Sequence, residues 1–168
     1  MSDLREVVDK LYSKILDFAS YSLRTEKEVR DRSAYYLRKI SFPGGVEPKT
    51  VVEEIITKLK NEGRLDDDKY TGRYLEGLLL SPKTKSIKEA SLFLYKKGIS
   101  ESISGKYLDQ FGSELEEKSL RILVEKKARS MKSPKDPSAR NKLIRYLVSK
   151  GFNPDRARVE VDKIPPLK

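Results

Sequence analysis

The chain has 168 residues, contains neither cysteine nor histidine, and carries a formal net charge of +10. It therefore lacks a disulfide framework, thiolate metal ligands and the usual general bases and nucleophiles. No apolar run approaches the roughly 18 residues that a membrane span needs, and the first residues show no secretory pattern. We expect a soluble cytoplasmic protein with no catalytic residues, no cofactor and no metal.

The N-terminal third has apolar residues at helical spacing in three segments. Thr25 and Glu28 have the form of a capping box at the start of the second segment, with Thr25 as the N-cap. Pro43-Gly44-Gly45 ends that segment, and Pro48 suits the first turn of the next helix. The spacing predicts helices over about residues 4–22, 26–40 and 48–61.

The middle of the chain repeats this plan. Asp66 is a natural N-cap, and the two carboxylates that follow it lie in the first turn, where the helix dipole attracts them. Consecutive residues on a helix point about 100° apart, so the three carboxylates are expected to cap the helix and not to bind a metal. Ser86 and Glu89 form a second capping box. The predicted helices run from 67 to the break at Pro82, from 87 to 97, and from Ser100 through Leu108.

The last third contains a motif that the middle third also contains. Lys97-Gly98-Ile99-Ser100 and Lys150-Gly151-Phe152-Asn153 each combine a helix stop, a hydrophobe and a residue able to cap the next helix. No segment alternates with period two, so no sheet is predicted. We predict an all-α fold of nine helices in three tandem three-helix repeats, similar to helix-turn-helix modules, over residues 7–62, 63–112 and 113–163.

The positive charge is concentrated in one segment. Residues 118–150 contain eleven basic residues against Glu125 and Asp136, so this segment carries +9 and the rest of the chain carries +1. Such a block indicates an anionic partner or an acidic protein surface, although it could also be a solvated surface without a partner. The nine tyrosines fit core or rim positions better than base stacking. The candidate contact residues are Lys118, Arg121, Arg129, Lys132, Arg140 and Arg145, with Lys83, Lys85 and Lys96 as a second patch.

One motif resembles the hallmark of the RecX family. The segment Glu62-Gly63-Arg64-Leu65-Asp66-Asp67-Asp68-Lys69-Tyr70, with Tyr74 after it, is similar to that family's Gly-aromatic-Leu-Asp-Asp stretch. Segments 23–29 and 142–152 are similar to the family's opening and final helix, so the resemblance covers about residues 10–163. It implies three tandem repeats in an elongated, curved array. It also implies a regulator that binds RecA recombinase filaments. We expect a monomer that contacts DNA through the filament or directly.

The resemblance further implies that this binding lowers the filament's ATPase and strand exchange in recombinational DNA repair. Arg64 stands where the family usually has tyrosine, and segments 41–45 and 81–85 also depart from its pattern. Two other functions stay open from the residues alone. One is a stand-alone helical protein that binds DNA or RNA, and the other is a helical protein-interaction scaffold.

Overall fold

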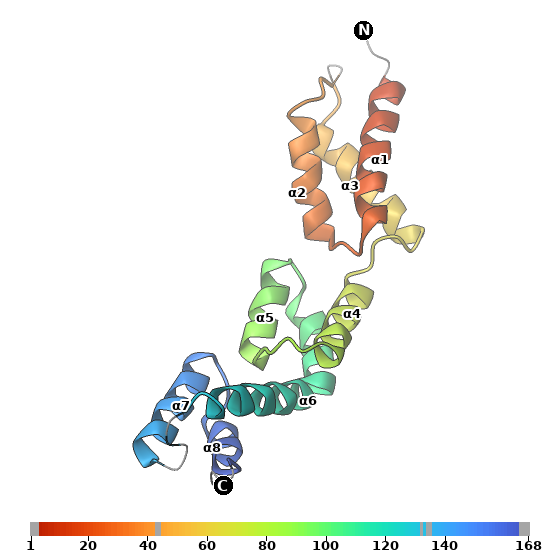
Figure 1. The fold of residues 1–168 in the computed structure, drawn as a ribbon. Coiled ribbons are helices and arrows are strands. Elements are labelled where there is room, and N and C mark those ends of the chain that lie inside the picture. Colours follow the sequence, from red (N-terminus) through yellow and green to blue (C-terminus); the bar gives the residue numbers. More distant parts are fainter. Residues whose placement is uncertain (1–3, 43–44, 132, 134–135, 165–168) are drawn as a thin grey trace. The chain divides into compact units, whose positions relative to one another are not determined.

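The computed structural model describes residues 4–42, 45–131, 133 and 136–164, and these residues form helices joined by turns (Figure 1). No strand occurs among them, which confirms the predicted all-α class. Most helices begin close to the predicted cap. The helices are α1 (Leu4–Tyr21), α2 (Glu26–Leu37), α3 (Pro48–Asn61), α4 (Asp67–Leu80), α5 (Ile87–Lys96), α6 (Glu101–Ala128), α7 (Pro137–Ser149) and α8 (Pro154–Asp162).

The first of two compact bodies contains α1, α2, α3 and the start of α4, together with residues 97–99. Its core is built by apolar stripes at the spacing that the sequence predicts, because a helix buries every third or fourth residue. The apolar stripe of α3 is buried along its whole length, at Val51, Val52, Ile55, Ile56 and Leu59. The core residues are Leu11, Ile15, Ala19, Val29, Val51, Val52, Ile55, Ile56, Leu59 and Leu65.

The second body contains the rest of α4, α5, α6, α7 and α8. Helix α5 packs on α6, and α7 and α8 pack on each other and on the second half of α6. Burial of the apolar stripes again supplies the main stabilisation. The core that α6, α7 and α8 share consists of Leu120, Val124, Leu143, Leu147, Phe152, Ala157, Val161 and Ile164.

Helix α6 differs from the sequence prediction. Two separate helices were expected on either side of residue 112, but α6 continues without a break for 28 residues. Residues 109–118 contain no proline, and the only helix breaker among them, Gly112, is buried with the Ile87 side chain 3.2 Å from the position of a Cβ. The described residues therefore form eight helices where nine were predicted. The three-helix plan is kept because the two halves of α6 serve the second and third sets.

In the first body, the capping box at the start of α2 also forms hydrogen bonds with the Lys97-Gly98 stop at the end of α5. Besides accepting the Glu28 N–H, the Thr25 hydroxyl donates a hydrogen bond of 2.7 Å to the Lys97 carbonyl. Glu28 accepts hydrogen bonds from the Thr25 N–H at 3.1 Å and from the Lys97 ammonium at 2.6 Å. Gly98 has φ +80, and a Cβ there would lie 2.5 Å from Lys27 Cβ. The Lys-Gly turn thus requires glycine for both its conformation and its close approach to α2.

The second body repeats this arrangement with the other capping box. The Ser86 hydroxyl accepts the Glu89 N–H at 3.1 Å and donates to the Lys150 carbonyl at 2.8 Å. Gly151 has φ +88, and a Cβ there would lie 3.0 Å from Ser86 Oγ. Both capping boxes and both Lys-Gly stops predicted from the sequence are confirmed. The structure adds that each box holds one of the stops.

The Glu28 carboxylate makes the stability of the first body depend on pH in the acidic range. Burial raises the pKa of Glu28, but hydrogen bonds from Lys97 and from the Thr25 N–H outweigh burial and hold the pKa below the ordinary value. Its stabilising effect should therefore be complete above the ordinary glutamate pKa of about 4.3 and be lost as the pH falls through the lower, folded-state value. We expect Glu28→Gln to lower the free energy of unfolding at pH 6 and to weaken its acid dependence, in urea titrations followed by circular dichroism.

Glu54→Gln is the matched control, because Glu54 is exposed on α3. Equal losses of stability between pH 6 and pH 3 in wild type and Glu28→Gln would show that this carboxylate does not set the acid response.

Candidate nucleic-acid interface

The loop between α4 and α5 is held against α6 by Lys118. The Lys118 ammonium donates to the carbonyls of Leu78, Ser81 and Lys83, at the C-terminal end of α4 and just beyond it. A cation at this end of a helix also complements the helix dipole. Burial lowers the pKa of Lys118. The structure thus places this predicted contact residue in an internal network, with its ammonium bound to the loop backbone.

The same loop brings two predicted basic patches together. The Lys85 N–H donates to Ser119 Oγ of α6 at 3.1 Å, and the next residue, Ser86, bonds to the Lys150 carbonyl after α7. Lys83 is exposed and Lys85 is half-buried. Lys96 ends α5, about 15 Å along the helix from its start. The structure therefore joins Lys83 and Lys85 to α6 and α7, but it leaves Lys96 apart from them.

Two cations lie beside the Tyr146 ring, a contact that was not predicted from the sequence. The ammonium groups of Lys127 and Lys150 lie 4.8 and 5.9 Å from the centre of its ring. Tyr146 and Lys150 also line a small cavity of about 130 Å³, together with Glu89. Tyr146 was expected at a core or rim position, and Lys127 and Lys150 were not among the predicted contact residues. A ring beside two cations provides a place where an anionic group could bind next to an aromatic edge.

The remaining predicted cations differ in their exposure and in their hydrogen-bond partners. Arg121, Arg129 and Arg145 are exposed, and the arginines at 121 and 129 make no ion pair among the described residues. Glu125 lies between these two on the same face of α6, which reduces the local charge. Arg140 is half-buried, and its guanidinium donates to Asp162 at 3.5 Å and to the Ile164 carbonyl at 3.2 Å. Lys132 lies outside the described residues.

The acidic segment at the start of α4 acts in helix capping. Asp66 Oδ1 accepts the Lys69 N–H at 2.9 Å, which confirms Asp66 as the N-cap. Asp67 Oδ1 accepts the Glu26 N–H at 2.9 Å. The described part of the chain contains no group of three or more metal-ligating side chains placed to share an ion. Across the same residues, no helix has both the length and the apolar character needed to cross a membrane.

The fold and the basic surface define an all-helical protein built from tandem three-helix units. A family model described as "RecX, third three-helix domain" matches residues 115–158. A regulatory protein RecX of Clostridium perfringens strain SM101 is 31% identical over 162 residues, covering 92% of this chain and 71% of that protein. A crystal structure of RecX from Lactobacillus salivarius has 29% identity and a TM-score of 0.77, covering 96% of this chain and 98% of the other. The chain belongs to the RecX family.

Several relatives in the family are longer than this chain. The regulatory protein RecX of Finegoldia magna is 32% identical, and the match covers 85% of this chain but 66% of that protein. For the RecX proteins of Limosilactobacillus reuteri and Bacillus cytotoxicus, the match covers 56% and 55% of the relative. The chain thus spans a little over half to about two thirds of these relatives. Each of these relatives is named as a regulatory protein.

Proposed function

We propose that this chain binds filaments of RecA-type recombinase on DNA and lowers their ATPase and strand exchange in the cytoplasm. Membership of the RecX family is the observation that carries this proposal. The +9 charge of residues 118–150 supports it, because a recombinase filament contains DNA phosphates and the exposed arginines of this segment are available to an anionic partner.

The tandem construction suits a filament as the partner. Repeated small helical units can contact several neighbouring subunits at once, so weak contacts combine into useful affinity. A monomer is sufficient for this mode of binding. In this proposal the loop 81–86, the exposed face of α6 and the end of α7 supply the electrostatic contacts. The protein itself performs no chemistry on nucleotides.

The single-stranded-DNA-dependent ATPase of the cognate recombinase tests the proposal. We expect the rate of ATP hydrolysis to fall as the protein is added at substoichiometric to equimolar ratios at moderate salt, with no hydrolysis by the protein alone. An unchanged rate over a wide titration would contradict the proposal. Duplex binding without recombinase would then favour the stand-alone nucleic-acid-binding function, and no affinity for polyanions would favour the scaffold.

A further inference from the structure

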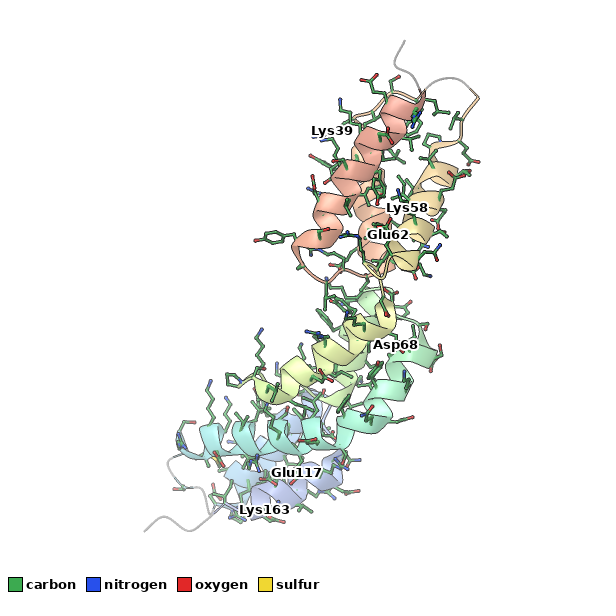
Figure 2. All side chains as sticks on the ribbon, turned by 90° about the vertical axis from the view of Figure 1, so that its right-hand side faces the viewer. Lys39, Lys58, Glu62, Asp68, Glu117 and Lys163 are labelled. Carbon is green, nitrogen blue, oxygen red and sulfur yellow. The ribbon has the colours of Figure 1, made fainter. Side chains whose placement is uncertain are left out.

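The first body has a cleft between α1 and α2 that the proposed function does not use. Its volume is about 520 Å³, within the range of small-molecule sites. Lys10 and Lys14 of α1 line one wall, and Tyr35 and Tyr36 of α2 line the other, with Lys39 just beyond the end of α2. Lys39, labelled in Figure 2, marks its position on the first body. The lining also contains Glu6, so a ligand's negative charge would bind on the lysine side.

The aromatic rings of this cleft are in close contact with cations. Lys39 Nζ lies 4.4 Å from the centre of the Tyr35 ring and donates to its hydroxyl at 2.6 Å. The Arg32 guanidinium lies 5.0 and 5.1 Å from the centres of the Tyr35 and Tyr36 rings, and Lys14 Nζ lies 5.7 Å from that of Tyr36. Hydrogen bonding by Lys39 lowers the pKa of Tyr35. The Tyr35 hydroxyl oxygen therefore accepts a hydrogen bond from Lys39, while Tyr35 stays 43% exposed.

Tyr35 combines a partly exposed ring with cations on both sides of it in the sequence. Tyr35 keeps 43% of its surface exposed, and Lys39 and Arg32 lie beside its ring. Three cations beside the two tyrosines, with Lys10 in the same lining, attract phosphates, and an exposed part of a ring offers a surface on which a base can stack. Bases of a duplex are stacked on one another and are not available in this way, whereas bases of a single strand are.

We propose that this cleft binds single-stranded nucleic acid, with an unpaired base on Tyr35 and the adjoining phosphates on Lys10, Lys14 and Lys39. The site lies in the first body, whereas the basic segment 118–150 belongs to the second. It goes beyond the proposed function, and its test contains no recombinase. Failure of one proposal therefore leaves the other standing.

The test measures binding of the full chain to two fluorescein-labelled 20-mers by anisotropy: oligo-dT and an abasic strand of the same length. Stacking of a base on an aromatic ring contributes about 1–3 kcal/mol, so Tyr35→Ala should weaken oligo-dT binding by about fivefold or more. Tyr35→Phe should bind nearly as wild type. The abasic strand should bind more weakly than oligo-dT to the wild type, and its affinity should not change in Tyr35→Ala.

Tyr21→Ala is the matched control, because Tyr21 lies on the same body and is 88% exposed. It should leave both affinities unchanged, whereas Lys10→Ala with Lys14→Ala should weaken both. Equal oligo-dT binding by wild type and Tyr35→Ala would overturn the proposal. Equal weakening by Tyr21→Ala and Tyr35→Ala, or displacement of oligo-dT by an equal concentration of an acidic peptide, would also overturn it.

Discussion

Reversal of Arg121, Arg129 and Arg145 to glutamate is expected to remove most of the inhibition of the recombinase ATPase. The three side chains are exposed and lie off the buried stripes, so the helical circular dichroism signal should not change. Each contact with a phosphate releases counterions, so the affinity for DNA depends strongly on the number of contacts and falls steeply as salt rises. We expect the concentration for half-inhibition to rise at least tenfold. The dependence of binding on salt should also become shallower, by about two to three in the log–log slope if all three residues contact phosphates.

A second triple variant controls for total charge. Lys69, Arg73 and Arg158 are exposed and lie outside the 118–150 segment, so reversing them changes the net charge by the same amount. This variant should retain most of the inhibition. If both triple variants lose inhibition to the same extent, the loss follows from the change in net charge and not from the three arginines of α6 and α7. If the first variant folds and inhibits like wild type, the arginines of α6 and α7 are not the contact surface, and Lys83, Lys85 and Lys96 become the next candidates.

Replacement of Lys118 by methionine is expected to destabilise the second body. Methionine keeps the length of the side chain but removes the donor that serves the carbonyls of Leu78, Ser81 and Lys83. Leaving such acceptors without a partner costs about 1–3 kcal/mol. We expect the free energy of unfolding to fall by about 2–3 kcal/mol in urea titrations. Helix α4 and the loop that follows it should lose protection first in hydrogen exchange.

Arg121→Met is the matched control on the same helix, since Arg121 is exposed. Its effect on stability should stay within about 0.5 kcal/mol. Comparison of the two variants shows whether Lys118 stabilises the fold or contacts the filament. A Lys118→Met protein with wild-type stability and weakened inhibition would mean that the ammonium contacts the filament and not the loop.

Local signals in the sequence were enough to predict most of the helical plan. A capping box, a Lys-Gly stop and an apolar stripe each act within a few residues, so Thr25, Ser86 and Gly98 could be assigned from their neighbours. The continuity of α6 was missed because Ser100 and the apolar spacing after it suggested a short helix. No local signal showed that Gly112 would pack against Ile87 inside a longer one.

The candidate sites were harder to predict, because they depend on contacts between residues distant in the sequence. The charge count selected Lys118, but only the fold shows that its ammonium binds carbonyls about 35 to 40 residues earlier. The row of cations and aromatic rings at the C-terminal end of α2 did have a signal in the sequence. Arg32, Tyr35 and Lys39 follow the spacing of three and four residues that places side chains together on a helix. The facing wall, Lys10 and Lys14 on α1, could not be paired with them without the fold.

Comparison of two binding curves tests the central claim most directly. The labelled wild-type chain would be titrated at one salt concentration against recombinase filaments assembled on single-stranded DNA and against the same DNA alone. We predict tighter binding to the filament, because protein contacts from several subunits add to the attraction of the phosphates. Equal or tighter binding to the bare strand would contradict the account and would identify the chain as a nucleic-acid-binding protein that acts without a recombinase.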